Sequence, residues 1–453
     1  MQIWRLVITI LSLWPLLGLA APLVHEYSLD NGLKLIVKVD KRAPVLTSMV
    51  WYKVGASYEP NGLTGISHML EHMMFQGTQA YPTGQFSTLI AENGGQQNAF
   101  TGADYTAYYQ NLAADKLALS FELEADRMQN LSLKEADFAK ELQVVMEERR
   151  LRTDDVPEAL TYERFAAAAF IANPYHHPII GWMNDLQNLR LADVNTWYQT
   201  WYAPNNATVV VVGDVVPEQV LALAKKYFAA IPQRMVPALK PQQEVAGLGE
   251  RRVLVKVPAQ VPTLIMGYNV PVIRDDQSSD TPYVLSVINA LLSGGNSARL
   301  EKNVVRKQQI ASAAYADYDP FARFSTVFIL GGTPAQQHSL NNLEAALFTQ
   351  IKELQTTLVD ESELARVKAQ IIAAKIFAQD SLTYQAMEIG LLETIGLSWQ
   401  AFDTFVAKVQ EVRPQQIQQV AQQYLIAERL TVAHLQPLAL TAAANAAGAS
   451  HVQ

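Results

Sequence analysis

The stretch HMLEHMMFQGT, residues 68–78, places two histidines four residues apart with a glutamate directly before the second. On an α-helix, residues i and i+4 project from the same face about 6 Å apart along the axis, so His68 and His72 can bind one metal ion. Glu71 lies about 100° around the helix from His72, which puts its carboxylate beside that ion. A carboxylate there can take a proton from a water molecule whose pKa a zinc ion has lowered. The spacing therefore indicates a hydrolytic zinc site.

The same five residues also fit an ordinary amphipathic helix whose Met and Leu side chains pack in a core while the histidines stay partly exposed. A hydrolytic zinc ion generally has three protein ligands and an open position for water, and two histidines supply only two. Because the chain contains no cysteine, the third ligand must be His, Asp or Glu, and disulfides and a cysteine nucleophile are excluded.

The composition is that of a folded, multi-domain protein. The chain has 453 residues, of which 49% are hydrophobic and 17% charged, so we expect two or more domains with full hydrophobic cores. The formal net charge of −8 argues against a nucleic-acid backbone as the main partner.

The first 20 residues predict a cleaved export signal. Arg5 precedes the apolar run LVITILSLWPLLGLA, and the small residues Gly18 and Ala20 lie where a signal peptidase would recognise them. A membrane anchor is the alternative, but the run is short for a spanning helix and Pro15 interrupts it. We therefore expect a periplasmic or secreted bacterial protein without a stable membrane anchor; the lack of disulfides suits the periplasm.

The rest of the chain divides into two similar parts. Residues 21–232 mix strand-like and helix-like patterns, ending with the buried strand NATVVVVGDV and the helical PEQVLALAKKYFAAI. Residues 233–250 contain two prolines and two glycines and predict a linker. Residues 251–436 repeat the order of elements in outline, which predicts an α+β protein made by internal duplication. Residues 437–453 have no core-forming pattern and predict a disordered tail.

HMLEHMMFQGT resembles the inverted zinc-binding motif, H-x-x-E-H, of the metallopeptidases that include pitrilysin, insulin-degrading enzyme and the mitochondrial processing peptidase. The segments ENGGQQNAFTGADYTAYY, NPYHHPIIGW and WYAPNNATVVVVGD also resemble blocks of that family, in the family's order, so the resemblance spans most of residues 25–440. It implies two homologous halves, each a mainly antiparallel sheet packed with helices. It also implies a zinc endopeptidase acting on peptides or unfolded segments, with Glu71 activating water.

The resemblance further implies the third ligand. In that family a glutamate on a later helix, some 75 residues on, follows a hydrophobic pair, and here ELQVVMEERR is in that place. Aligning residues 144–146 with the apolar triplet assigns the ligand to Glu148, where 148 − 72 = 76, with Glu147 as the neighbouring alternative. Glu141 matches the family's second acidic residue, which supports the zinc ligands.

Two more expectations concern substrate and stoichiometry. The segment matching Asn98 to Thr101 is, in relatives, a sheet edge that receives the substrate backbone as an added strand. Asn98, Ala99 and Phe100 are the candidates for that contact; the alternative is that these residues only build the strand. Duplicated members keep zinc ligands in the first half only. Since Ser286, Asn289 and Ala290 cannot form an equivalent second site, one Zn²⁺ per chain is expected.

The second half of such enzymes usually contributes an arginine and, seven residues later, a tyrosine that steady the substrate carbonyl. Here Arg306 is followed at position 313 by alanine, and Tyr315 comes two residues late. The resemblance therefore suggests a zinc-bearing subunit that pairs with a homologous zinc-less subunit carrying the Arg/Tyr pair, or forms a homodimer.

Five other histidines are not expected to bind metal. By resemblance, His176 and His177 belong to a structural loop before Gly181. The isolated His25, His338 and His434 have no ligand spacing and are expected to be surface or structural residues. Two other functions stay open at this point: a non-catalytic scaffold of the same family, and a zinc-binding protein that needs no base at Glu71.

Overall fold

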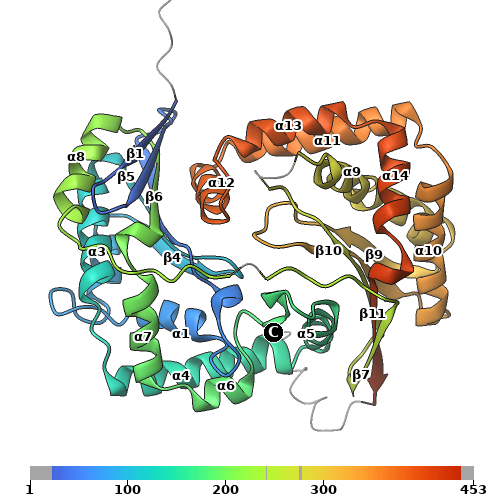
Figure 1. Ribbon diagram of the computed structural model, residues 1–453, viewed down its shortest axis with the longest axis horizontal. Helices are drawn as coiled ribbons and strands as arrows, with labels where there is room; N and C mark the ends of the chain where they lie inside the picture. The colour runs from blue at the N-terminus through green and yellow to red at the C-terminus, as the bar shows by residue number, and fades with distance from the viewer. Residues whose placement is uncertain (1–22, 241, 275–277, 440–453) are drawn as a thin grey trace, which may run out of the picture.

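The chain is described here by a computed structural model that covers residues 23–240, 242–274 and 278–439. The expected signal at residues 1–20 lies outside the described residues. Two halves, each built around its own sheet, face one another in Figure 1, and residues 233–250 run between them without forming a helix or a strand in their described part.

The N-terminal half contains a six-stranded sheet of order β1-β2-β6-β3-β5-β4. β2 and β6 are parallel, and the other neighbouring pairs are antiparallel. The valine run of β6 is fully buried because this strand lies inside the sheet with helices on both faces. The strands are β1 (Val24–Ser28), β2 (Lys34–Val39), β3 (Val45–Tyr52), β4 (Gln96–Thr101), β5 (Thr106–Ala113) and β6 (Ala207–Gly213).

Most helices of this half share one hydrophobic core with one face of the sheet. The helices of the N-terminal half are α1 (Ile66–Met73), α2 (Gln85–Glu92), α3 (Leu117–Asn130), α4 (Glu135–Arg149), α5 (Pro157–Ala169), α6 (Met183–Asn188), α7 (Leu191–Trp201) and α8 (Pro217–Phe228). One π-helical turn, Arg150–Asp154, prolongs α4. The exception is α5, which packs on the sheet of the C-terminal half.

The C-terminal half repeats this plan with a five-stranded sheet of order β7-β11-β8-β10-β9. Its one parallel pair, β7 and β11, corresponds to β2 and β6, and its other pairs are antiparallel. The α+β class and the two homologous halves are thus confirmed. The strands are β7 (Arg251–Pro258), β8 (Thr263–Val270), β9 (Ala311–Asp317), β10 (Thr326–Pro334) and β11 (Leu430–Leu438).

Most helices of this half also gather in one core on one face of their sheet, and α12 is the exception. The helices of the C-terminal half are α9 (Thr281–Ser293), α10 (Leu340–Thr356), α11 (Glu361–Ala378), α12 (Leu382–Thr394), α13 (Ala401–Glu411) and α14 (Pro414–Tyr424), with a π-helical segment at Leu300–Lys307.

The two halves exchange one helix each. α5 of the first half packs on the second sheet, and α12 of the second half packs on the first sheet, as Figure 1 shows. Both contacts depend on a glycine: a Cβ at Gly390 of α12 would lie 2.1 Å from the indole nitrogen of Trp51, and one at Gly267 of β8 would lie 2.3 Å from the ring of Phe165. Each half therefore completes the other's core.

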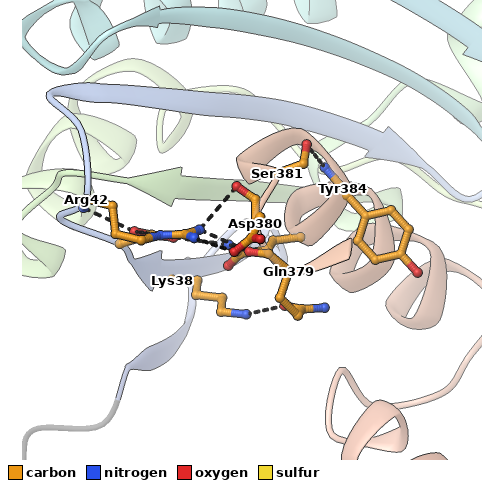
Figure 2. Close-up of polar contacts among 8 residues, drawn as sticks. Lys38, Arg42, Gln379, Asp380, Ser381 and Tyr384 are labelled. Atoms are coloured by element: carbon orange, nitrogen blue, oxygen red, sulfur yellow. Dashed lines mark hydrogen bonds and ion pairs between the residues drawn. The ribbon is translucent and has the colours of Figure 1, made fainter. Parts of the chain in front are cut away.

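Polar contacts also join the halves where α11 ends (Figure 2). The guanidinium of Arg42, after β2, donates to Asp380 Oδ1 at 2.9 Å and to the Gln379 carbonyl at 3.0 Å, and Lys38 Nζ donates to Gln379 Oε1 at 3.0 Å. Arg42 also binds Asp40, which holds the pKa of that carboxyl down at about 2. These bonds connect the rim of the first sheet to the start of α12.

One expected boundary was wrong by two residues. The disordered tail was expected from residue 437, but β11 continues to Leu438 and pairs with β7 up to Pro258. β11 pairs with β8 only as far as Leu435, so Pro437 needs no hydrogen-bond donor on that side and can stay in the strand. The rest of the expected tail, from residue 440, lies outside the described residues.

Candidate metal centre

Helix α1 carries the motif on one face and a core stripe on the other. Ile66, Met69, Leu70 and Met73 are buried at helical spacing and pack in the core of the first half. The two histidines and Glu71 lie on the remaining face and are only partly buried. The amphipathic helix considered as an alternative is therefore real, and it is also what aims the three polar side chains in one direction.

The start of α1 is fixed by a buried carboxylate. Glu59 accepts hydrogen bonds from the backbone N–H of Gly65 at 2.7 Å and of Ser67 at 2.8 Å, which satisfies donors at the helix N-terminus. The indole of Trp197 in α7 donates to Ser67 Oγ at 3.2 Å. The helix that presents His68 is thus tied to the body of the first half.

Helix α4 brings a glutamate to the two histidines. Glu148 Oε2 lies 3.4 Å from His72 Nε2 and 3.8 Å from His68 Nε2, and the three ligand atoms all lie within 4.8 Å of one another. Two ligands of a tetrahedral zinc ion, each about 2.0–2.1 Å from the metal, stand about 3.4 Å apart. These three side chains, called the metal cluster below, therefore fit a zinc ion with little movement.

The structure distinguishes Glu148 from its neighbour. Glu147 points to solvent and pairs with Arg150 at 2.9 Å, with 58% of its side chain exposed. Glu148 is held from the other side by Arg152, one helical turn later, whose Nη1 lies 2.6 Å from Glu148 Oε1. One carboxylate oxygen is thus engaged by a cation while the other faces the histidines.

The surroundings of both imidazoles favour metal binding. Glu141 Oε2 lies 3.3 Å from His72 Nδ1, where it can accept that N–H and leave Nε2 with a free lone pair, and Gln76 steadies the other Glu141 oxygen at 3.0 Å. Burial, with smaller effects from His72 and Arg152, lowers the pKa of His68 to about 3. His68 is therefore neutral at physiological pH, as a metal ligand must be.

Glu71 is anchored beside the metal cluster. Its Oε2 accepts a hydrogen bond from the hydroxyl of Thr101, at the end of β4, which leaves Oε1 for another partner. Burial raises the pKa of Glu71, and the Thr101 hydrogen bond and His72 oppose the rise. A carboxylate with a raised pKa, fixed at one oxygen, is suited to accept and return a proton.

The metal cluster and Glu71 open into a large cavity, called the central cavity below. It has a volume of about 990 Å³ and lies between the two halves. The edge strand β4, which pairs only with β5 among the described strands, forms part of its wall through Asn98, Ala99 and Phe100. An open strand edge beside a metal site can take up an extended peptide by strand addition.

Other sequence-predicted residues are placed as follows. His176 and His177 line the central cavity but are not part of the metal cluster, and His177 Nε2 lies 2.9 Å from Asn61 Oδ1. His434 pairs with Glu344 at 2.8 Å in the second half. The region of α9 with Ser286, Asn289 and Ala290 contributes no carboxylate or imidazole to a metal group among the described residues.

Arg306 and Tyr315 do not line the central cavity. Arg306 lies in the last turn of the helical segment after α9, pairs with Glu301 at 3.2 Å, and borders a separate groove with Lys302 and Lys307. β9 does contain an irregularity between Ala311 and Ala313, but the Tyr315 hydroxyl still lies against Gly331 of β10. Within this chain, neither side chain is presented to the metal cluster.

Sequence reasoning missed three side chains of this site. Arg152 follows Glu148 at the i+4 spacing of a helix, a signal that was available. Thr101 and Asp319, both in the cavity wall, had no local signal because strand pairing and the apposition of the halves bring them there.

Comparison with known families gives two sequence models that match consecutive parts of the chain. The sequence model described as "Insulinase (Peptidase family M16)" matches residues 34–182, which contain the metal cluster, Glu71 and Glu141. The model described as "Peptidase M16 inactive domain" matches residues 188–371, which contain no residue of the metal cluster but do include α7, β6 and α8 of the first half.

Among curated proteins, the chain is similar to the zinc protease PqqE of Helicobacter pylori, with 35% identity over 76% of this chain and 78% of that protein. An uncharacterized zinc protease of Rickettsia felis is 29% identical over 80% of this chain and 85% of the relative.

Solved structures show the same fold. The crystal structure of a protease from Helicobacter pylori superposes with a TM-score of 0.86 and 29% identity, covering 91% of this chain and 99% of that one. The first half of the periplasmic protease PqqL of Escherichia coli superposes with a TM-score of 0.77 at 20% identity, over 94% of this chain and 95% of that half. With the family models, the relatives and the fold in agreement, the chain belongs to the M16 family of peptidases, the family of pitrilysin and insulin-degrading enzyme.

Proposed function

We propose that this chain is a zinc-dependent endopeptidase that hydrolyses peptides or unfolded segments in the central cavity. The observation that carries the proposal is the position of Glu71, beside the metal cluster, anchored by Thr101, and in the same cavity as the open edge of β4. A scaffold or a zinc-binding protein needs neither the anchored base nor the strand edge.

The residues divide the work as follows. His68, His72 and Glu148 would hold the zinc ion, which when bound lowers the pKa of water and polarises a carbonyl. Glu71 accepts the proton of the attacking water and later passes it to the leaving amine. Thr101 keeps one oxygen of Glu71 occupied, so that the other faces the reacting groups. The β4 edge, at Asn98, Ala99 and Phe100, aligns the substrate backbone.

The test is metal analysis of the purified chain beside cleavage of an internally quenched peptide. We expect one zinc ion per chain, bound by the metal cluster, and cleavage within the peptide rather than at its ends. A well-folded preparation that contains no detectable zinc after incubation with Zn²⁺ and removal of the excess contradicts the proposal. So does a zinc-loaded preparation that cleaves no peptide alone or with a homologous partner.

We also propose that a second, homologous chain completes the enzyme. The support is that Arg306 and Tyr315 do not line the central cavity, so this pair does not supply carbonyl-stabilising donors to its own chain's site. Paired units occur among similar folds. The superposition on full-length PqqL includes 94% of this chain but only 49% of PqqL, whose first half this chain matches. A zinc-less subunit with an Arg/Tyr pair, or a second copy of this chain, would fill this role.

Adding the partner is expected to raise the rate of peptide cleavage at least about tenfold, since one donor to a developing oxyanion contributes on that scale or more. The measurement is kcat for the chain alone, for the chain with the product of a neighbouring homologous gene, and as a function of its own concentration. If kcat is the same for the monomer, for the chain with the homologous partner and at high concentration of the chain, the second chain is not needed.

We propose export to the periplasm or beyond the cell. The support is the basic and then apolar N-terminal sequence with Gly18 and Ala20 before the expected cleavage point. None of the helices within the described ranges is long and apolar enough to cross a membrane. Mass analysis of the N-terminus of protein from a periplasmic extract tests this; an intact Met1 would contradict it.

A further inference from the structure

Asp319 lies on the wall of the central cavity that the second half supplies, between β9 and β10. Its side chain is exposed to the interior of the cavity, although protein surrounds it on most sides. The backbone N–H of Phe321 donates to its Oδ1 at 2.8 Å, which fixes the carboxylate. The turn between β4 and β5, which ends at Tyr105, lines the same cavity.

The other carboxylates of the cavity that serve no catalytic role already have partners. Asp104 accepts hydrogen bonds from Ser57, at 2.7 Å, and from Tyr175, and lies 3.5 Å from Arg323. Glu163 pairs with Arg149 at 2.8 Å.

Asp319 differs from both, because no cation lies within 4.0 Å of it among the described residues. The lysine whose charge reaches it, Lys375, forms its own ion pair with Glu388 at 3.2 Å. Burial, with the charges of Asp317 and Asp104, raises the pKa of Asp319 to about 6. A cation placed against this carboxylate would offset the unfavourable burial of its charge.

We propose that Asp319 forms a subsite for an arginine or lysine side chain of the peptide substrate, which makes this residue a determinant of specificity. The proposal rests on the peptidase function proposed above. The fixed carboxylate offers its free oxygen to a guanidinium or ammonium group by a charge-assisted hydrogen bond. The rings of Tyr105 and Phe321, which also line the cavity, can pack against the aliphatic stem or the planar guanidinium.

The test measures binding rather than cleavage, so that it does not depend on turnover. Labelled eight-residue peptides carry one arginine, stepped through the positions, and each has a twin with neutral citrulline in its place. Their affinities for the full-length chain carrying Glu71→Gln are read by fluorescence anisotropy. We expect one position at which arginine binds about tenfold more tightly than citrulline, as a charge-assisted hydrogen bond implies.

Asp319→Asn in the same background should reduce that preference to within about twofold, while Asp317→Asn should preserve it, because Asp317 is exposed on β9 and does not line the cavity. Asp319→Lys should prefer glutamate to arginine at the same position. No positional preference, a preference that survives Asp319→Asn, or no binding of any peptide would each overturn the subsite. If the preference follows Asp319 but the wild-type chain cleaves nothing, the proposed activity fails and the subsite stands.

Discussion

Replacing Glu71 with glutamine is expected to reduce kcat for peptide cleavage by about 10²- to 10⁴-fold, the usual contribution of a general base, while zinc content stays at the wild-type level. Glutamine has the shape of glutamate, and its carbonyl can still accept the Thr101 hydroxyl, so the cavity wall should not change. It cannot accept a proton from water at neutral pH.

The matched control is Glu147→Gln, which makes the same chemical change on the exposed side of α4 and should leave both kcat and zinc content unchanged. Zinc content and cleavage are measured on the same preparations. Activity within tenfold of wild type in Glu71→Gln would mean that another group takes the proton. Loss of zinc from that variant would make Glu71 a support for the metal, and a wild-type chain without any activity would favour the scaffold or the zinc-binding protein.

Local periodicity was enough to predict the two elements that carry the metal cluster. The core stripe of α1 and the motif on its other face follow directly from the spacing of residues 66–73. The choice between Glu147 and Glu148 was harder, because a shift of one residue turns a side chain by about 100°. The spacing of Glu141, Glu148 and Arg152, by seven and then four residues, would have favoured Glu148, since all three lie on one face of the helix.

The exchange of α5 and α12 between the halves could not be predicted in this way. A helical pattern shows which face of a helix is apolar but not which sheet will cover it. Trp51 and Gly390 are 339 residues apart, and only the tertiary fold shows that one needs the other to be glycine. The placement of Asp319 in the same cavity as the metal cluster depends on the same apposition of the halves.

The positions of the Arg306 and Tyr315 side chains could not be predicted from their spacing in the sequence, for a different reason. A fixed distance in sequence places two side chains together only if the strand between them keeps its register, and β9 shifts register between Ala311 and Ala313. The helical segment before it also turns Arg306 toward Glu301 and away from the central cavity. The sequence correctly showed that the pair is irregular, but only the fold shows where the two side chains go.

Removing Arg127 is expected to destabilise the first half more than any surface change. Arg127 of α3 is buried, its Nε donates to Glu124 Oε2 at 2.8 Å, and its guanidinium lies over the rings of Phe86 and Tyr108, 4.5 and 4.3 Å from their centres. Arg127→Met leaves the Glu124 carboxylate buried without its cation, which costs about 3–5 kcal/mol. For a unit of about 200 residues this lowers Tm by about 6–20 °C.

The double variant Arg127→Met/Glu124→Gln separates the loss of the pair from the loss of packing. It leaves no buried charge, and Gln110, which already donates to Glu124, can stay hydrogen-bonded to the new amide, so most of the lost stability should return. Arg150→Met is the control, since it breaks an exposed ion pair and should change Tm by no more than about 2–4 °C. Calorimetry on all four chains decides the point. If Arg127→Met unfolds no earlier than Arg150→Met, the guanidinium does not stabilise this core. If the double variant is no more stable than the single one, the stability lost with Arg127 comes from its contacts with the rings rather than from compensating Glu124.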